Sequence, residues 1–68
     1  MENKRQLQVG DTIRCQGIVA TIATIAFQEP WEWRGSWYLE FRDTKGVYRS
    51  WKQNSDGGYA VNSEGVRI

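Results

Sequence analysis

The segment WYLEFRDTKGVYRSW, residues 37–51, constrains the fold most, because it predicts two strands, the turn between them and their register. The turn is Asp43-Thr44-Lys45-Gly46. This pattern is typical of a three-residue hairpin loop in which the glycine is left-handed and forms a bulge. A two-residue loop would shift the pairing by one residue and place Trp37 opposite a lysine, so we favour the bulged turn. It pairs Asp43 with Val47, Arg42 with Tyr48, Phe41 with Arg49, Leu39 with Trp51, and Tyr38 with Lys52.

The register assigns the side chains of this hairpin to two faces, because side chains alternate along a strand. The face predicted to meet the core collects Trp37, Leu39, Phe41, Val47 and Trp51. The other face, predicted to meet water, collects Tyr38, Glu40, Arg42, Tyr48, Ser50 and Lys52. Arg49 does not fit this division, since it is a charged residue on the inner face.

The chain is short enough to be one domain, at 68 residues. Proteins of this size gain only about 3 to 5 kcal/mol of net stability from their core unless a disulfide, a metal or self-association adds to it. Cys15 is the only cysteine and there is no histidine, so the sequence predicts neither an internal disulfide nor a zinc site. Four tryptophans are the available source of buried area.

The N-terminal half predicts an arm and two strands. Residues 1–8 are polar and read as a flexible arm, with Leu7 and Val9 as its first anchors. Residues 12–16 alternate as a short strand, and Gly17 ends it. Residues 18–27 are rich in β-branched side chains and favour a strand, although a helix is the alternative, because three isoleucines also fit helical spacing. The apolar pattern changes phase near Ala23 and Thr24, which predicts a bulge there.

Residues 28–36 are predicted to be a loop or a sheet edge, because Pro30 cannot donate a ladder hydrogen bond. If residues 34–36 reverse the chain, Trp33 lies opposite Trp37 and Trp31 lies opposite Leu39, with both tryptophans toward the core. Residues 53–58 predict a turn, and residues 59–61 a strand that pairs back on the strand of Trp51. Val66 and Ile68 either add a last short pairing or cover one end.

These elements predict an all-β domain over residues 9–68, a small five-stranded, antiparallel and partly open barrel. The layout of VGDxI, a glycine, a long bent strand and a hairpin resembles the Src-homology-three-like barrels over about residues 9–61. The resemblance is architectural and rests on no family motif, so it implies a fold and no particular function.

The residue types argue against an enzyme and against a resident cofactor or metal. Without histidine, a Ser-His or Cys-His nucleophile has no general base. Cys15 on an alternating strand reads as a small apolar residue. Glu29 and Glu32 are a carboxylate pair, but they lie in the segment that contains Pro30, where solvated charge is the simpler interpretation. The absence of a leader or a membrane-spanning run in the sequence predicts a cytoplasmic protein.

Two surfaces are candidates for binding. Trp31, Trp33 and Arg34 are types enriched in interface hot spots and predict a protein or peptide site, unless the tryptophans close the barrel end. The second surface combines aromatic rings with cations, as a platform for single-stranded nucleic acid does, and consists of Tyr38, Arg42, Tyr48 and Lys52. The alternative interpretation is an ordinary solvated sheet face. The net charge of +1 gives no global attraction to a polyanion. Our hypothesis is a protein-binding adaptor or inhibitor that uses both surfaces; a nucleic-acid binder and a homo-oligomer with buried aromatics are the alternatives.

Overall fold

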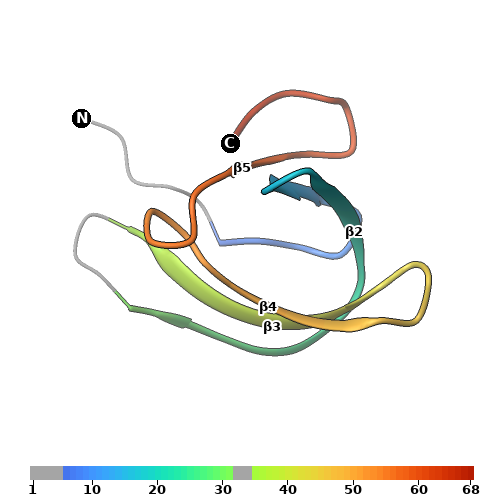
Figure 1. Cartoon of the computed structure of the whole chain (residues 1–68), viewed down its shortest axis with the longest axis horizontal. Helices are drawn as coiled ribbons and strands as arrows, with labels where there is room; N and C mark the ends of the chain where they lie inside the picture. Colours follow the sequence, from blue (N-terminus) through green and yellow to red (C-terminus); the bar gives the residue numbers. More distant parts are fainter. Residues whose placement is uncertain (1–5, 32–34) are drawn as a thin grey trace.

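The chain folds into one antiparallel sheet of five strands, shown in Figure 1 by a computed structural model that describes residues 6–31 and 35–68. Its order is β4-β3-β2-β1-β5. The predicted all-β class with five antiparallel strands is confirmed. The sheet is not closed, because β4 and β5 are its two edges and do not pair with each other. The strands are β1 (Thr12–Cys15), β2 (Ile18–Pro30), β3 (Trp37–Asp43), β4 (Tyr48–Lys52) and β5 (Tyr59–Val61).

The β3–β4 hairpin has the predicted turn and register. Gly46 has a φ of 84°, and its N–H donates to the carbonyl of Asp43 at 2.9 Å. The ladder pairs Arg42 with Tyr48 and continues to Tyr38 with Lys52, as the turn type requires. Leu39, Phe41 and Trp51 are buried as predicted, whereas Trp37 is only half-buried. Val47 is 43% exposed, because it lies beside the turn, beyond the end of the core.

Strand β2 joins the two parts of the sheet, since its first residues pair with β1 and the following ones with β3. Figure 1 shows it curving from one part to the other. The predicted bulge near Thr24 is confirmed by a register shift between Ile22 and Thr24, and the segment is a strand rather than a helix. A second shift, between Ile25 and Phe27, was not predicted.

The loop predicted for residues 28–36 is shorter than expected, and the pairing predicted there is wrong. Strand β2 continues to Pro30, and Gln28 rather than Trp31 lies opposite Leu39. The N–H of Trp31 donates to the carbonyl of Ser36, the residue before β3, at 3.3 Å. Because hydrogen-bonded and non-hydrogen-bonded pairs alternate along an antiparallel ladder, the backbone nitrogen of Pro30 faces away from β3. Its missing N–H therefore costs no ladder bond. Trp33 lies outside the described residues.

Strand β5 pairs with β1, not with β4 as predicted. The preceding loop is anchored beside β4 by the indole N–H of Trp51, which donates to the carbonyl of Gly57 at 2.8 Å. The chain then crosses to β1, where Tyr59 lies opposite Arg14. The expected last pairing is present as a single bridge between Val61 and Arg67, and Ile68 packs against the core.

The core lies inside the curve of the sheet. Leu7, expected as an anchor, is buried, while Val9 is 62% exposed. The side-chain amide of Gln28 holds Leu7 in place: it accepts the N–H of Leu7 at 2.9 Å and donates to its carbonyl at 3.1 Å. The buried apolar residues are Leu7, Ile13, Ala20, Ile22, Leu39, Phe41, Trp51 and Ala60.

Candidate functional site

The outer face of the β3–β4 hairpin brings four of the predicted site residues together. Tyr38 and Arg42 lie on β3, and their cross-strand partners Lys52 and Tyr48 lie on β4. Both cross-strand pairs lie on the face that the predicted register assigned to solvent. Trp31 lies beyond the end of this face, and Trp33 and Arg34 are outside the described residues.

The carboxylate of Glu40 organises the two tyrosines. The hydroxyl of Tyr48 donates to Oε1 of Glu40 at 2.6 Å, and the hydroxyl of Tyr38 donates to Oε2. One charged group therefore fixes two rings that come from neighbouring strands. The sequence placed Glu40 between the tyrosines, but only the pairing of β3 with β4 brings both hydroxyls to one carboxylate.

The same hydrogen bonds shift the pKa of all three groups. The bond to Glu40, followed by burial and by the charge of Glu40, raises the pKa of Tyr38 to about 12. The bond to Glu40 also raises the pKa of Tyr48. The hydroxyls of Tyr38 and then Tyr48 hold the pKa of Glu40 below its ordinary value of 4.5, so this carboxylate is ionised at neutral pH.

Phe27 is a member of this surface that the sequence pattern did not identify. It is 46% exposed and meets the ring of Tyr38 edge to face, with 6.1 Å between ring centroids. Its phase along β2 matches Ile25, so simple alternation places both on the inner face. The unpredicted bulge between them turns Phe27 outward instead. We call Phe27, Tyr38, Glu40 and Tyr48 the aromatic face.

The cations of the predicted platform lie at the border of the aromatic face. The guanidinium of Arg42 lies 5.8 Å from the ring centroid of Tyr48 and donates to the carbonyl of Gly46 at 2.9 Å. The ammonium of Lys52 lies 5.7 Å from the ring centroid of Trp31. Both cations thus already contact a ring of the protein itself.

Trp31 is half-buried, so it is neither a fully buried core residue nor a fully exposed binding residue, the two interpretations that the sequence left open. Its indole N–H donates to the carbonyl of Gln53 at 2.9 Å. Gln53 is itself buried, and its Oε1 accepts the N–H of Trp37 at 3.0 Å. Trp31 is therefore tied to the end of the hairpin while part of its surface stays open to solvent.

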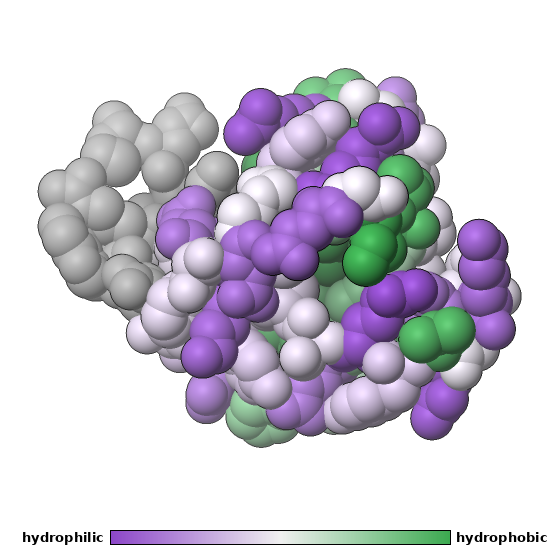
Figure 2. Space-filling model, in the orientation of Figure 1, coloured by the Kyte–Doolittle hydropathy of each residue, from purple (hydrophilic) through white to green (hydrophobic). Residues whose placement is uncertain are grey.

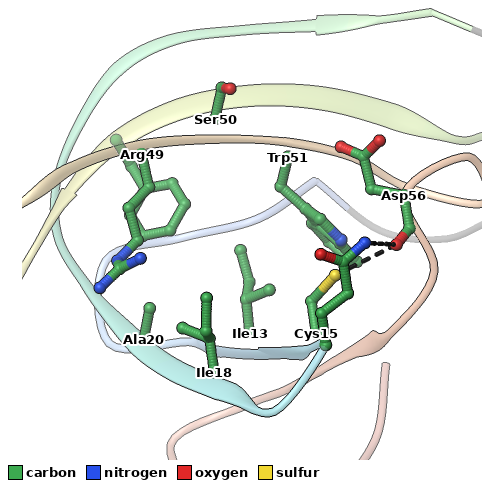
Figure 3. A pocket seen from close by; sticks show the side chains of 10 residues that line it. Ile13, Cys15, Ile18, Ala20, Arg49, Ser50, Trp51 and Asp56 are labelled. Atoms are coloured by element: carbon green, nitrogen blue, oxygen red, sulfur yellow. Dashed lines mark hydrogen bonds between the residues drawn. The ribbon is translucent and has the colours of Figure 1, made fainter.

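The inner side of the sheet holds a pocket of about 250 Å³ between β4 and the β1–β2 hairpin. Figure 2 shows this face of the molecule hollowed, with hydrophobic residues visible in the hollow. Ile13, Ile18 and Ala20 line one side, and Trp51 and Arg49 line the other (Figure 3). The pocket forms because the sheet is open. The sequence predicted a partly open barrel, but no local sequence pattern indicated this pocket.

The polar groups at the far end of the pocket bond to each other. The thiol of Cys15 donates to the carbonyl of Asp56 at 3.2 Å, and the side-chain amide of Gln16 donates to the same oxygen at 3.2 Å (Figure 3). Cys15 is a free cysteine. Over residues 6–31 and 35–68, no three His, Cys, Asp or Glu side chains are grouped as metal ligands.

Comparison with known proteins finds no matching family model, no matching curated protein and no matching solved structure. Among the described residues, no helix combines the length and the hydropathy needed to cross a membrane.

Proposed function

We propose that this chain is a non-enzymatic protein-binding module that holds a protein or peptide partner on the aromatic face. The observation that carries the proposal is the shared carboxylate of Glu40, which fixes the rings of Tyr38 and Tyr48 before a partner arrives. Ordering side chains is one of the costs of association, and rings already held in place avoid part of it.

The composition of the aromatic face supports the same proposal. Tyrosine is enriched in interface hot spots because it combines a large apolar ring with a polar tip. Tyr48 and Phe27 are 51% and 46% exposed, so their rings offer apolar area to a partner. Trp31 extends this area at the end of the hairpin. We infer that the module acts as an adaptor or as an inhibitor of a larger partner.

The architecture we propose is a partly open, Src-homology-three-like barrel. What supports it is the long bent strand β2, whose first part pairs with β1 and whose second part pairs with β3. In small barrels of this kind, aromatic side chains beside a loop line grooves for extended peptides.

Charge argues for a protein rather than a nucleic acid on this face. The ionised Glu40 lies at its centre, and Glu29 lies opposite Tyr38 on β2, where its negative charge helps to raise the pKa of that tyrosine. Two carboxylates among the rings repel the phosphates that stacked bases would bring. Arg42 and Lys52 offset this charge only at the border.

Affinity capture from the native host tests the proposal. The tagged chain is compared with Tyr48→Ala and Phe27→Ala, and with Val66→Ala as a matched control, since Val66 is an equally exposed apolar residue away from the aromatic face. We expect one partner to be captured by the wild type and the control but lost from both aromatic variants, with melting temperatures nearly unchanged. Capture that neither aromatic variant weakens would remove the aromatic face from the proposal.

Two further measurements separate the rival functions. A nucleic-acid binder should retain oligonucleotides at low salt, release them steeply as salt rises, and lose affinity in Arg42→Ala and Lys52→Ala. A homo-oligomer should change mass across a dilution series. We expect no oligonucleotide binding and a constant monomer mass.

A further inference from the structure

The outer edge of β4 has backbone groups that face away from the sheet. In an antiparallel pair, hydrogen-bonded and non-hydrogen-bonded residue pairs alternate. The N–H of Asp43 donates to the carbonyl of Val47 at 2.9 Å, and the N–H of Gln53 donates to the carbonyl of Trp37 at 3.0 Å. These two bonds fix the alternation along the whole strand. The residues of β4 whose N–H and carbonyl face outward are therefore Tyr48, Ser50 and Lys52.

Only part of this edge is open. The N–H of Lys52 donates to the carboxylate of Asp56 at 2.9 Å, and its carbonyl accepts the N–H groups of Ser55 and Asp56. The loop after β4 thus covers Lys52. Among the described residues, the outward N–H and carbonyl groups of Tyr48 and Ser50 have no partner. Two residues with four backbone groups remain as a short pairing edge.

The pocket lies directly beside this open edge. Its wall on the β4 side is formed by Arg49 and Trp51, whose side chains point inward from the same stretch of strand. Across the pocket lies Ile18, which is 45% exposed. A strand added to the edge would place every second side chain over this hollow, because side chains alternate along a strand.

We propose that the edge of β4 binds an extended peptide as a sixth, antiparallel strand, with an aliphatic residue followed two positions later by Asp or Glu. Every pair in this sheet is antiparallel, which sets the direction of the added strand. The residue opposite Trp51 then comes first in the peptide and the residue opposite Arg49 comes third. Their side chains face the pocket, while the residue between them bonds to Ser50.

The size and charge of the pocket determine which two peptide side chains it accepts. The apolar walls and the volume of about 250 Å³ accommodate one aliphatic side chain between Trp51 and Ile18. Arg49 uses its Nε–H for Asp43, and among the described residues its other guanidinium nitrogens have no partner. A carboxylate opposite Arg49 would accept from them. Arg49 and Trp51 lie at non-hydrogen-bonded positions of the added pair, where side chains approach most closely.

This site uses the inner side chains and the backbone edge of β4, whereas the aromatic face uses side chains that point outward, so the two are tested with different variants. The probe is the peptide acetyl-Thr-Leu-Thr-Glu-Thr-amide, compared with versions in which Lys replaces Leu or Glu. Hydrogen exchange read by NMR should show new protection at the amides of Tyr48 and Ser50. Both replacement peptides should bind at least about tenfold more weakly.

Three variants locate the site on the protein. Ser50→Pro removes an edge donor that no internal bond uses, and proline is tolerated at such edge positions. Ile18→Lys fills the mouth of the pocket, whereas Val19→Lys, on an exposed neighbour outside the pocket, is its matched control. We expect Ser50→Pro and Ile18→Lys to lower the affinity at least about tenfold and Val19→Lys to leave it within about twofold.

Several outcomes would overturn the proposal. They are no binding of the Leu-Glu peptide, binding that Ile18→Lys does not weaken, or protection confined to amides outside Tyr48 and Ser50. Protection of these two amides by concentrated protein alone would show that a second copy of the chain occupies the edge, and would equally overturn it. Tyr48→Ala and Phe27→Ala, which test the aromatic face, play no part in this result.

Discussion

Arg49 donates from its Nε to Oδ2 of Asp43 across 2.8 Å, and this ion pair completes the inner face of the β3–β4 hairpin. Asp43 is only 3% exposed, and its other oxygen, Oδ1, accepts the N–H groups of Lys45 and Val47 at 2.9 Å each. A single carboxylate therefore holds the turn and also binds the Nε–H of the cation that points inward from β4. Arg49 can therefore lie on the otherwise apolar inner face because it has an anionic partner, Asp43, at the rim of the core.

Acid should weaken the fold through Asp43. The hydrogen bond from Arg49, followed by that from Val47, lowers the pKa of Asp43 from its ordinary 3.8. The folded state thus binds this proton less readily than the unfolded chain does. The stabilisation is complete above pH 3.8 and is lost as the pH falls through the lower folded-state pKa.

Urea unfolding of the wild type and Asp43→Asn at neutral pH and at about pH 3 checks this expectation. We expect the variant to be markedly less stable at neutral pH, because Arg49 loses its anion, and the difference to shrink in acid. Glu64→Gln is the control for loss of an exposed carboxylate. An equal difference at both pH values would contradict the assignment.

Gly58 should be far less replaceable than Gly57, although both have positive φ, 79° and 82°. A Cβ on Gly58 would lie 2.3 Å from the carbonyl oxygen of Arg14 and 2.7 Å from the Cβ of Cys15, whereas a Cβ on Gly57 meets nothing within 4 Å. Gly57→Ala should cost only the left-handed strain, about 1 to 2 kcal/mol. Gly58→Ala must also displace β5 from β1, so we expect it to be largely unfolded by circular dichroism. Equal melting temperatures would contradict this packing.

Tyr38 should titrate about two pH units above an ordinary tyrosine, because its pKa is raised from 10.0 to about 12. Losing its proton would break its bond to Glu40 and place two negative charges together. In Glu40→Gln the pKa of Tyr38 and of Tyr48 should fall toward 10.0, as followed by the NMR shift of the ring carbon bearing the hydroxyl. Glu64→Gln, in an exposed turn, should change neither. An unshifted Tyr38 in the wild type would show that the shared carboxylate does not hold both rings.

How far the sequence predicts this fold depends on whether a constraint is local. Asp43 and Gly46 determine their own turn, and the register of β3 and β4 follows from that turn alone. The same register places Asp43 diagonally across from Arg49 on the inner face, so the ion pair could have been predicted from it. These features needed only residues close together in the chain.

The features that the sequence did not predict depend on distant parts of the chain. A proline lacks the N–H that would bond to a neighbouring strand on one side of its own strand. Whether the nitrogen of Pro30 faces β3 or faces away from it depends on the register of β2. The second bulge in β2 leaves no trace in the apolar pattern, so alternation alone places Phe27 on the wrong face. The choice of β1 as the partner of β5 involves residues more than forty positions apart, and the pocket beside β4 is a consequence of that choice.

Trp31 and Trp51 should respond very differently to replacement by alanine, which resolves the question that the sequence left open about the tryptophans. Trp51 is 3% exposed in the core, and losing a buried tryptophan costs about 3 to 5 kcal/mol. A core of this size supplies about 3 to 5 kcal/mol in all, so Trp51→Ala should be unfolded in water.

Trp31 is half-buried, and replacing it by alanine removes its hydrogen bond to the carbonyl of Gln53 and its contact with Lys52. The bond is worth about 1 kcal/mol, so Trp31→Ala should stay folded with a lower urea midpoint. Tryptophan fluorescence and far-ultraviolet circular dichroism during urea unfolding measure both variants, and Trp31→Phe separates loss of the bond from loss of the ring. If Trp31→Ala also unfolds in water, then Trp31 is part of the core, and the surface available to a partner is limited to the aromatic face.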